Sequence, residues 1–121
     1  MKLSQFINRS SKGKAAEELA CVHLKQNGLK LIEKNFYSRF GEIDLIMQHG
    51  DALVFIEVRY RKNQSFGGAK ASITHSKQSK IRKTALYYMQ KKGREFNARF
   101  DVLAITGEDK SLTYEWIQNA F

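Results

Sequence analysis

The chain has 121 residues, of which 42% are hydrophobic and 12% aromatic, a composition typical of one globular domain and not of a disordered chain. No apolar run approaches the length of a membrane span, and no segment resembles a cleavable signal sequence. The single cysteine, Cys21, excludes an internal disulfide and favours the reducing cytoplasm, where we expect it to be a small core residue.

The charge pattern favours a polyanionic partner. The formal net charge is +9, and the stretch 58–94 carries eleven Lys or Arg residues without one Asp or Glu. Basic composition alone does not separate DNA from RNA, or either from a protein that is basic only for solubility. Four acids outside or at the edge of this stretch lie in segments that also carry apolar runs: Glu17, Glu42, Asp44 and Glu57.

The N-terminal half begins with the polar, basic residues 1–12, which we expect to be loosely ordered ahead of a single domain at 13–121. An amphipathic helix is predicted over 15–27 and ends at Gly28. Its apolar residues follow helical spacing: Ala16, Leu19, Ala20 and Leu24.

The remaining elements complete the order α-β-β-β-α-β-β. A second helix is predicted from an N-cap at Thr74 to about Lys92, with Gly93 after it and a loop around 66–68 before it. This order allows a parallel crossover, so we predict an α/β (α+β) fold with a mixed sheet flanked by helices. The predicted strands are 30–37, 42–48, 52–60, 98–106 and 111–118.

The hairpin between the second and third strands predicts a metal site. A two-residue turn at 50–51 places Asp44 directly opposite Glu57. Glu42 then lies opposite Arg59, and side-chain alternation puts all four residues on one face of the sheet. Facing carboxylates repel each other unless a cation lies between them, and Mg²⁺ takes one or two carboxylates together with water and phosphate oxygens.

An ordinary structural interpretation stands beside this one. Glu42 and Asp44 can be solvent-facing residues of an antiparallel strand, although Leu53 and Phe55 share the face of Glu57 and favour its burial. Buried carboxylates need a partner, which favours the metal site.

The two helices carry the other candidates. Glu17 borders the apolar stripe of the first helix, where it is either an ordinary rim charge or a contributor to a site on the sheet. Lys77 and Lys80 occupy the first turns of the second helix, where the helix dipole disfavours cations. They indicate either a phosphate site or a solvated basic face. Tyr87, together with Tyr88 and Trp116, is interpreted as a core aromatic, with base stacking as the alternative.

Two segments carry a family resemblance, 41–46 (GEIDLI) and 55–61 (FIEVRYR). With the matches that follow, the chain resembles the bacterial YraN-like family from Gly13 to about Ile105. Those matches are Gly13, Glu17, Ala20, Leu24, Asn35, Phe66-Gly67, Lys77-Gln78 and Arg99-Phe100-Asp101-Val102.

That family resembles a branch of the PD-(D/E)xK superfamily, which includes restriction endonucleases and archaeal Holliday-junction resolvases. The resemblance implies a restriction-endonuclease-like αβββαβ core. It also implies that Asp44 and Glu57 bind Mg²⁺ or Mn²⁺, with Glu17 completing or supporting the site. Contacts to nucleic acid are expected from Arg61, Lys77, Gln78 and Lys80.

One position departs from the superfamily pattern, because Arg59 stands where the catalytic Lys is usual. An arginine stays protonated and cannot be a general base. It can still stabilise the transition state or position the scissile phosphate, and activation of water would then depend on the metal. Arg59 therefore belongs to the predicted catalytic set with Glu17, Asp44 and Glu57.

These features predict a divalent-metal-dependent endonuclease that acts on DNA, branched or single-stranded. The alternatives are a nuclease fold that binds nucleic acid for a partner enzyme and cuts poorly or not at all, and an RNA-directed nuclease. We expect a cytoplasmic monomer or homodimer that has no membrane partner and works with DNA or RNA, with a protein partner in DNA processing as a further expectation.

Overall fold

The computed structural model describes residues 9–63 and 73–121, so the expected loop around 66–68 and the first residues of the chain lie outside the described residues. The first helix begins at Arg9, earlier than expected, since no proline precedes Ala15 to stop it. In chain order the elements are α1 (Arg9–Gln26), β1 (Lys30–Ser38), β2 (Gly41–His49), β3 (Ala52–Arg61), α3 (His75–Lys92), β4 (Asn97–Thr106), the 3-10 helix η2 (Asp109–Ser111) and β5 (Thr113–Ile117).

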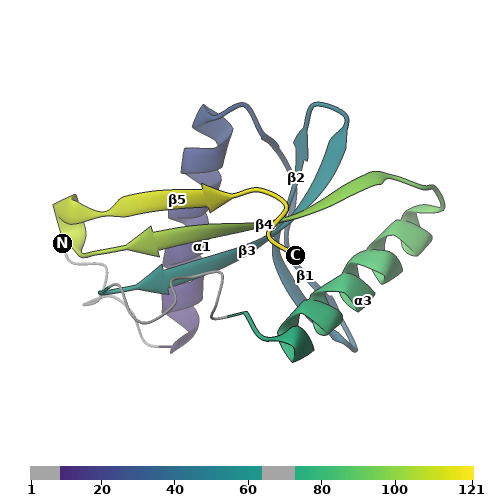
Figure 1. Cartoon of the computed structure of the whole chain (residues 1–121), viewed down its shortest axis with the longest axis horizontal. Coiled ribbons are helices and arrows are strands. Elements are labelled where there is room, and N and C mark those ends of the chain that lie inside the picture. Colours follow the sequence, from purple (N-terminus) through teal and green to yellow (C-terminus); the bar gives the residue numbers. More distant parts are fainter. Residues whose placement is uncertain (1–8, 64–72) are drawn as a thin grey trace.

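The strands form one mixed sheet in the order β1-β2-β3-β4-β5 (Figure 1). β1, β2 and β3 are an antiparallel meander, β4 pairs with β3 in parallel, and β5 returns antiparallel to β4. The parallel pair requires the crossover that contains α3. The structure thus confirms the predicted fold class, with the αβββαβ order of a restriction-endonuclease-like core.

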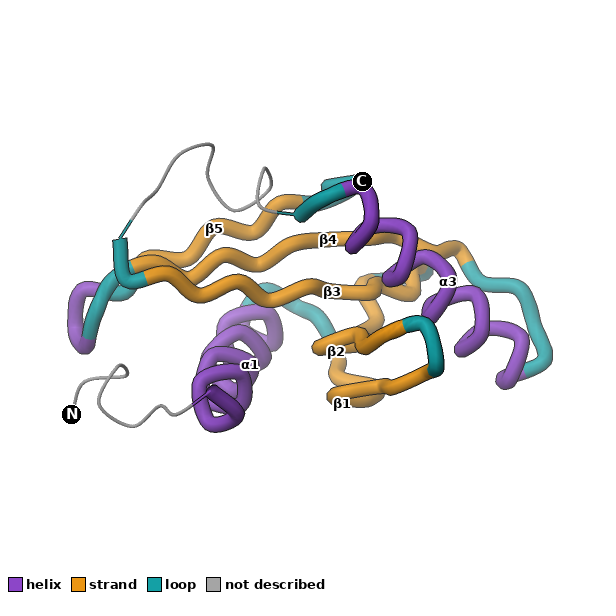
Figure 2. Tube along the Cα trace, turned by 90° about the horizontal axis from the view of Figure 1, so that it is seen from below, coloured by secondary structure: helices purple, strands orange, loops and turns teal. Residues whose placement is uncertain are grey.

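The two described α-helices cover opposite faces of the sheet (Figure 2). Ala16, Ala20 and Leu24 of α1 pack on one face, in a cluster that also contains Val54 and Ile56 of β3. Cys21 is buried in the same cluster, as expected. Within the described residues, neither helix combines the length and apolar character needed to cross a membrane.

On the other face, α3 buries Ile81, Ala85 and Tyr88 against Phe36 and Phe55. Its ends confirm the sequence prediction. The hydroxyl of Thr74 accepts a hydrogen bond from the backbone N–H of Lys77 at 3.1 Å, and Gly93 adopts a left-handed conformation with φ +74°.

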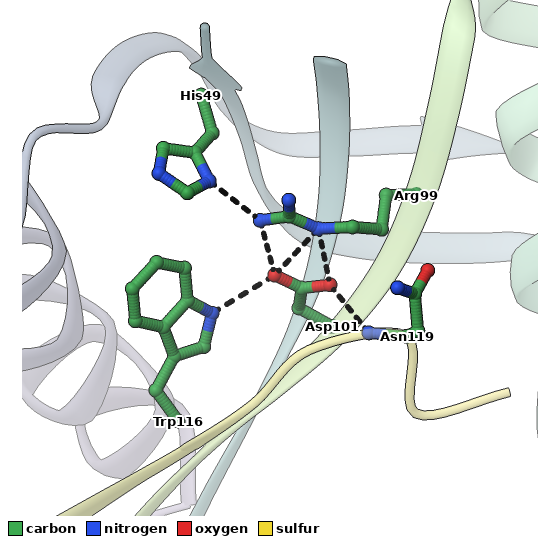
Figure 3. Close-up of polar contacts among 5 residues, drawn as sticks. All are labelled: His49, Arg99, Asp101, Trp116 and Asn119. Atoms are coloured by element: carbon green, nitrogen blue, oxygen red, sulfur yellow. Dashed lines mark hydrogen bonds and ion pairs between the residues drawn. The ribbon is translucent and has the colours of Figure 1, made fainter.

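A buried carboxylate joins β4 to β5 and to the segment that follows β5. Asp101 of β4, with no exposed surface, forms an ion pair with Arg99 at 2.9 Å (Figure 3). It also accepts hydrogen bonds from the indole N–H of Trp116 at 2.8 Å and the backbone N–H of Asn119 at 3.1 Å. These contacts attach β5 and the segment after it to β4. The guanidinium of Arg99 in turn lies 2.9 Å from the Nδ1 atom of His49.

Candidate metal centre

The β2–β3 hairpin has the predicted register, since Leu45 pairs with Ile56 and His49 with Ala52. The pairing ends at Leu45, one residue before Asp44 and Glu57 would face each other. There the backbone N–H of Val58 donates to the Oδ2 atom of Asp44 at 2.8 Å. The Asp44 side chain therefore lies where the ladder opens, between the two strands.

The expected one-face arrangement of four residues is wrong, because β2 does not alternate regularly. Ile43 packs with the α3 cluster, whereas Leu45, two residues later, packs with the α1 cluster. A regular strand would place both on one face. The irregularity lies opposite Asn35, a residue of β1 with φ +51°, which an L-residue other than Asn or Asp rarely adopts within a strand.

Three carboxylates meet at this irregularity. Glu17 of α1 and Glu42 and Asp44 of β2 each offer an oxygen within 4.8 Å of the others. The Nδ2 atom of Asn35 donates to both Glu17, at 2.7 Å, and Glu42, at 3.0 Å. The left-handed backbone of Asn35 thus places its side-chain amide where it can donate to both Glu17 and Glu42. Sequence reasoning had placed Glu42 on the face of the site but had given no role to Glu42 or Asn35.

Glu57 completes the acidic group from β3 and is only 4% exposed. It lies within hydrogen-bonding reach of Asp44. Two cations contact its carboxylate: the Nζ atom of Lys77 at 3.1 Å and the Nη2 atom of Arg59 at 3.4 Å. Lys77 comes from the first turn of α3, so the cation predicted from the sequence to contact phosphate lies beside the acids.

The electrostatics of the group favour bound positive charge. Burial raises the pKa of Asp44 well above its usual value, and the nearby Glu57 carboxylate raises it further. Burial also raises the pKa of Glu17; the Asn35 amide partly offsets this, while Glu42 adds to it. Two neighbouring acids that both resist ionisation are stabilised when a cation replaces their protons.

The residues fit a small hard cation. Carboxylate oxygens are the donors that Mg²⁺ and Mn²⁺ prefer, whereas the described residues offer no cysteine or histidine to this group. The acids open into a cleft of about 270 Å³ that also exposes Arg59 and Lys77. The Nε atom of Arg59 is buried and has no hydrogen-bond acceptor among the described residues, so its hydrogen-bonding capacity is unmet.

The other predicted nucleic-acid contacts lie outside the cleft. Gln78 donates from Nε2 to the backbone carbonyl of Ile73 at 3.1 Å, so its amide fixes the entry to α3. Lys80 is exposed on α3 near Gly41 of the β1–β2 turn. Arg61 is half-buried at the end of β3. The structure therefore brings together Glu17, Asp44, Glu57, Arg59 and Lys77.

The raised pKa values predict a pH effect on stability. In the folded state Asp44 retains a proton that the unfolded chain releases near pH 4, so its contribution to stability is lost as pH rises from about 4 through the raised pKa. In EDTA, Asp44→Asn should therefore gain thermal stability relative to wild type between pH 5 and pH 8. Added Mn²⁺ should reverse this order at pH 8, since the cation stabilises only the wild type. An equal Mn²⁺ effect on both proteins would exclude Asp44 as a ligand.

The fold and the site together define a class: a mixed-sheet α/β domain with clustered carboxylates and two cations where β2 and β3 separate. A sequence profile described as "Uncharacterised protein family UPF0102" matches residues 16–105. The chain belongs to the UPF0102 family, which confirms the resemblance to the YraN-like proteins.

Relatives match along almost the whole chain. A UPF0102 protein of Psychromonas ingrahamii is 55% identical over 122 residues, covering 100% of this chain and 98% of that protein. One from Nitrosomonas eutropha is 52% identical over 92% of this chain and 93% of its own length. One from Legionella pneumophila is 52% identical over 91% and 93%.

Proposed function

We propose that this protein is a divalent-metal-dependent endonuclease that hydrolyses phosphodiester bonds in DNA. The observation that carries the proposal is one cleft in which three mutually close carboxylates lie beside a half-buried arginine and a lysine. Carboxylates alone would repel a phosphodiester, and cations alone would bind it without hydrolysis. The two together provide a metal site next to a phosphate site.

The acids would hold the metal. Glu17, Glu42 and Asp44 offer oxygens close enough to share one Mg²⁺ or Mn²⁺ ion. When bound, such an ion supplies positive charge at a phosphoryl oxygen and favours ionisation of the attacking water. Asn35 positions Glu17 and Glu42 by donating to both, and the N–H of Val58 fixes the orientation of Asp44.

The cations would hold the substrate. Arg59 keeps its charge throughout the reaction, so its role is to bind the scissile phosphate and the charge that develops on it. Arg59 lines the cleft, where its guanidinium forms an ion pair with Glu57. Lys77 contacts the same Oε2 atom of Glu57 and offers a second cation to the phosphate.

We propose in addition that the chain belongs to the PD-(D/E)xK superfamily. The αβββαβ order, with Asp44 on β2 and Glu57 and Arg59 on β3, follows the pattern of PD-(D/E)xK nucleases. In that pattern Glu57 would be a metal ligand as well, and Lys77 and Arg59 form ion pairs with it. Because Cys21 is the sole cysteine, we also propose a cytoplasmic location.

One observation favours a second candidate. Arg59 replaces the Lys that the superfamily uses, which is the change expected of a nuclease fold that binds nucleic acid for a partner enzyme and has lost most of its cutting activity. RNA in place of DNA is a variant of either candidate, since basic charge does not distinguish the two polymers.

A cleavage panel tests the proposal. We expect Mn²⁺- or Mg²⁺-dependent cutting of at least one substrate among duplex, single-stranded, flap and four-way-junction DNA, and none in EDTA. Arg59→Lys should retain part of that activity, because lysine keeps the charge and loses the bidentate contact. If Arg59→Lys instead raises activity from near zero, the binding module is the correct candidate for the wild type. Cutting of RNA alone would exclude DNA as the substrate.

A further inference from the structure

A second hollow lies beside the metal centre, between the β1–β2 turn and α3, and has a volume of about 480 Å³. Figure 1 shows that turn next to α3, and Figure 2 shows the same neighbourhood from below. The residues that line this hollow, here called the aromatic groove, include no acid. The main ones are Tyr37, Arg39, Phe40, Lys83, Leu86 and Tyr87.

Large apolar side chains are unusually exposed in the aromatic groove. Tyr37 is 67% exposed, Leu86 53% and Tyr87 43%. Within the described residues, Val22 and Ile32 are the other large apolar side chains with comparable exposure, and neither lines the groove. Tyr87 was expected in the core. It projects outward because α3 buries Tyr88 instead, on the side facing the sheet.

Two cations lie near the half-buried ring of Phe40 in the groove. The guanidinium of Arg39 lies 4.9 Å from the centre of the Phe40 ring, and the Nζ atom of Lys83 lies 5.8 Å from it. Both cations are exposed. Exposed rings interleaved with cations are the features by which proteins bind single-stranded nucleic acid, since bases stack on the rings while cations contact the phosphates.

A row of lysines on α3 runs from the metal centre to the aromatic groove. Lys77 contacts Glu57, Lys80 lies beside Gly41, Lys83 approaches Phe40, and these residues follow one another at a spacing of three on one side of the helix. Tyr87 extends this line, and it lies about 15 Å from Lys77 along the helix axis.

A second contact joins the two sites. Tyr37 of the groove pairs with Glu42 across β1 and β2, and its phenol lies within hydrogen-bonding reach of the Glu42 carboxylate. A ligand in the groove therefore lies next to the acids that would hold the metal.

We infer that the aromatic groove binds unpaired bases of the DNA strand that enters the metal centre, and so selects substrates with a single-stranded segment. The inference rests on the proposed function for its choice of nucleic acid as the ligand. In a duplex the faces of the bases are covered by neighbouring base pairs, so exposed rings can stack only on unpaired bases. The line of lysines on α3 contacts the phosphates of the same strand.

Binding in EDTA, where no cleavage occurs, tests the inference. The probes are a fluorescein-labelled oligothymidylate of about 12 nucleotides and a duplex of the same length, followed by fluorescence anisotropy with the full chain. Tyr87→Ala should weaken binding of the single strand about 5- to 150-fold, and Tyr87→Phe should bind like wild type. Duplex affinity should change less than about twofold, since stacking is not available to it.

Two further variants complete the design. Val22→Ala removes an apolar side chain of α1 that is 53% exposed and lies outside the groove, and it should leave both affinities unchanged. Lys83→Gln should lower the salt dependence of single-strand binding by about 0.7 log units per log unit of salt. Equal loss on single strand and duplex, or no loss in Tyr87→Ala, would overturn the inference even if the protein cuts DNA. Selective loss in a protein that never cuts would support the groove and contradict the proposed nuclease.

Discussion

Asp44→Asn is expected to reduce metal-dependent cleavage by at least about 100-fold while DNA affinity is retained or improved. Asp44 lies between the other acids, within hydrogen-bonding reach of both Glu17 and Glu57. An amide at this position can still accept the N–H of Val58, so the fold is preserved, but it contributes no charge to a cation. Affinity is retained because the amide places no negative charge near the phosphate.

The matched control is Glu18→Gln, which removes the acid that follows the site residue Glu17 on α1. Glu18 is exposed and pairs with Lys34 at 2.6 Å, away from the cleft. We expect its cleavage rate to equal that of wild type in the same assay, with single-turnover rates measured at saturating protein. Equal rates for Asp44→Asn and wild type would exclude the metal centre. Loss of DNA binding in Asp44→Asn would indicate a folding defect, which thermal unfolding would detect.

Asp101→Ala is expected to reduce the free energy of unfolding by about 3–5 kcal/mol, because it leaves an arginine that is only 14% exposed without its counter-ion. Asp101 is fully buried and receives hydrogen bonds from Arg99, Trp116 and Asn119 (Figure 3). Removal of the carboxylate also frees the C-terminal segment from β4. Urea unfolding followed by circular dichroism measures the loss.

Two comparisons distinguish the loss of the ion pair from the effect on stability of shortening any acidic side chain. Glu115→Ala removes an exposed acid from β5 and should change stability by no more than about 0.5 kcal/mol. In Arg99→Ala/Asp101→Ala the cost should be smaller than the sum of the two single substitutions, since neither partner is left alone. An additive double variant would show that the pair does not interact.

The fold could be predicted from the sequence because its signals are local. Thr74 and Gly93 end α3 as their side-chain and backbone preferences predict, and a two-residue turn fixed the β2–β3 register. The parallel pairing of β3 and β4 followed from the order of the elements. The start of α1 was predicted too late, because helix ends depend on weak preferences.

The site was less predictable, because its geometry depends on an irregularity that periodicity cannot show. The rule of alternation assigned Glu42, Asp44 and Glu57 to one face, whereas β2 changes face at Asp44. In β1 the corresponding change of face occurs at Asn35, which adopts a left-handed backbone. A single Asn in a polar strand does not by itself predict such a conformation. Glu17 was assigned a supporting role from the family resemblance, since its helical position alone favoured a rim charge.

The irregularity of β1 also has a consequence for solubility. β1 is an edge strand, and a regular edge offers a row of unpaired N–H and C=O groups on which another chain can add a strand. The register shift between Leu31 and Glu33 and the left-handed Asn35 divide that row into short pieces. The left-handed backbone that lets Asn35 donate to Glu17 and Glu42 thus also makes this edge a poor template for aggregation.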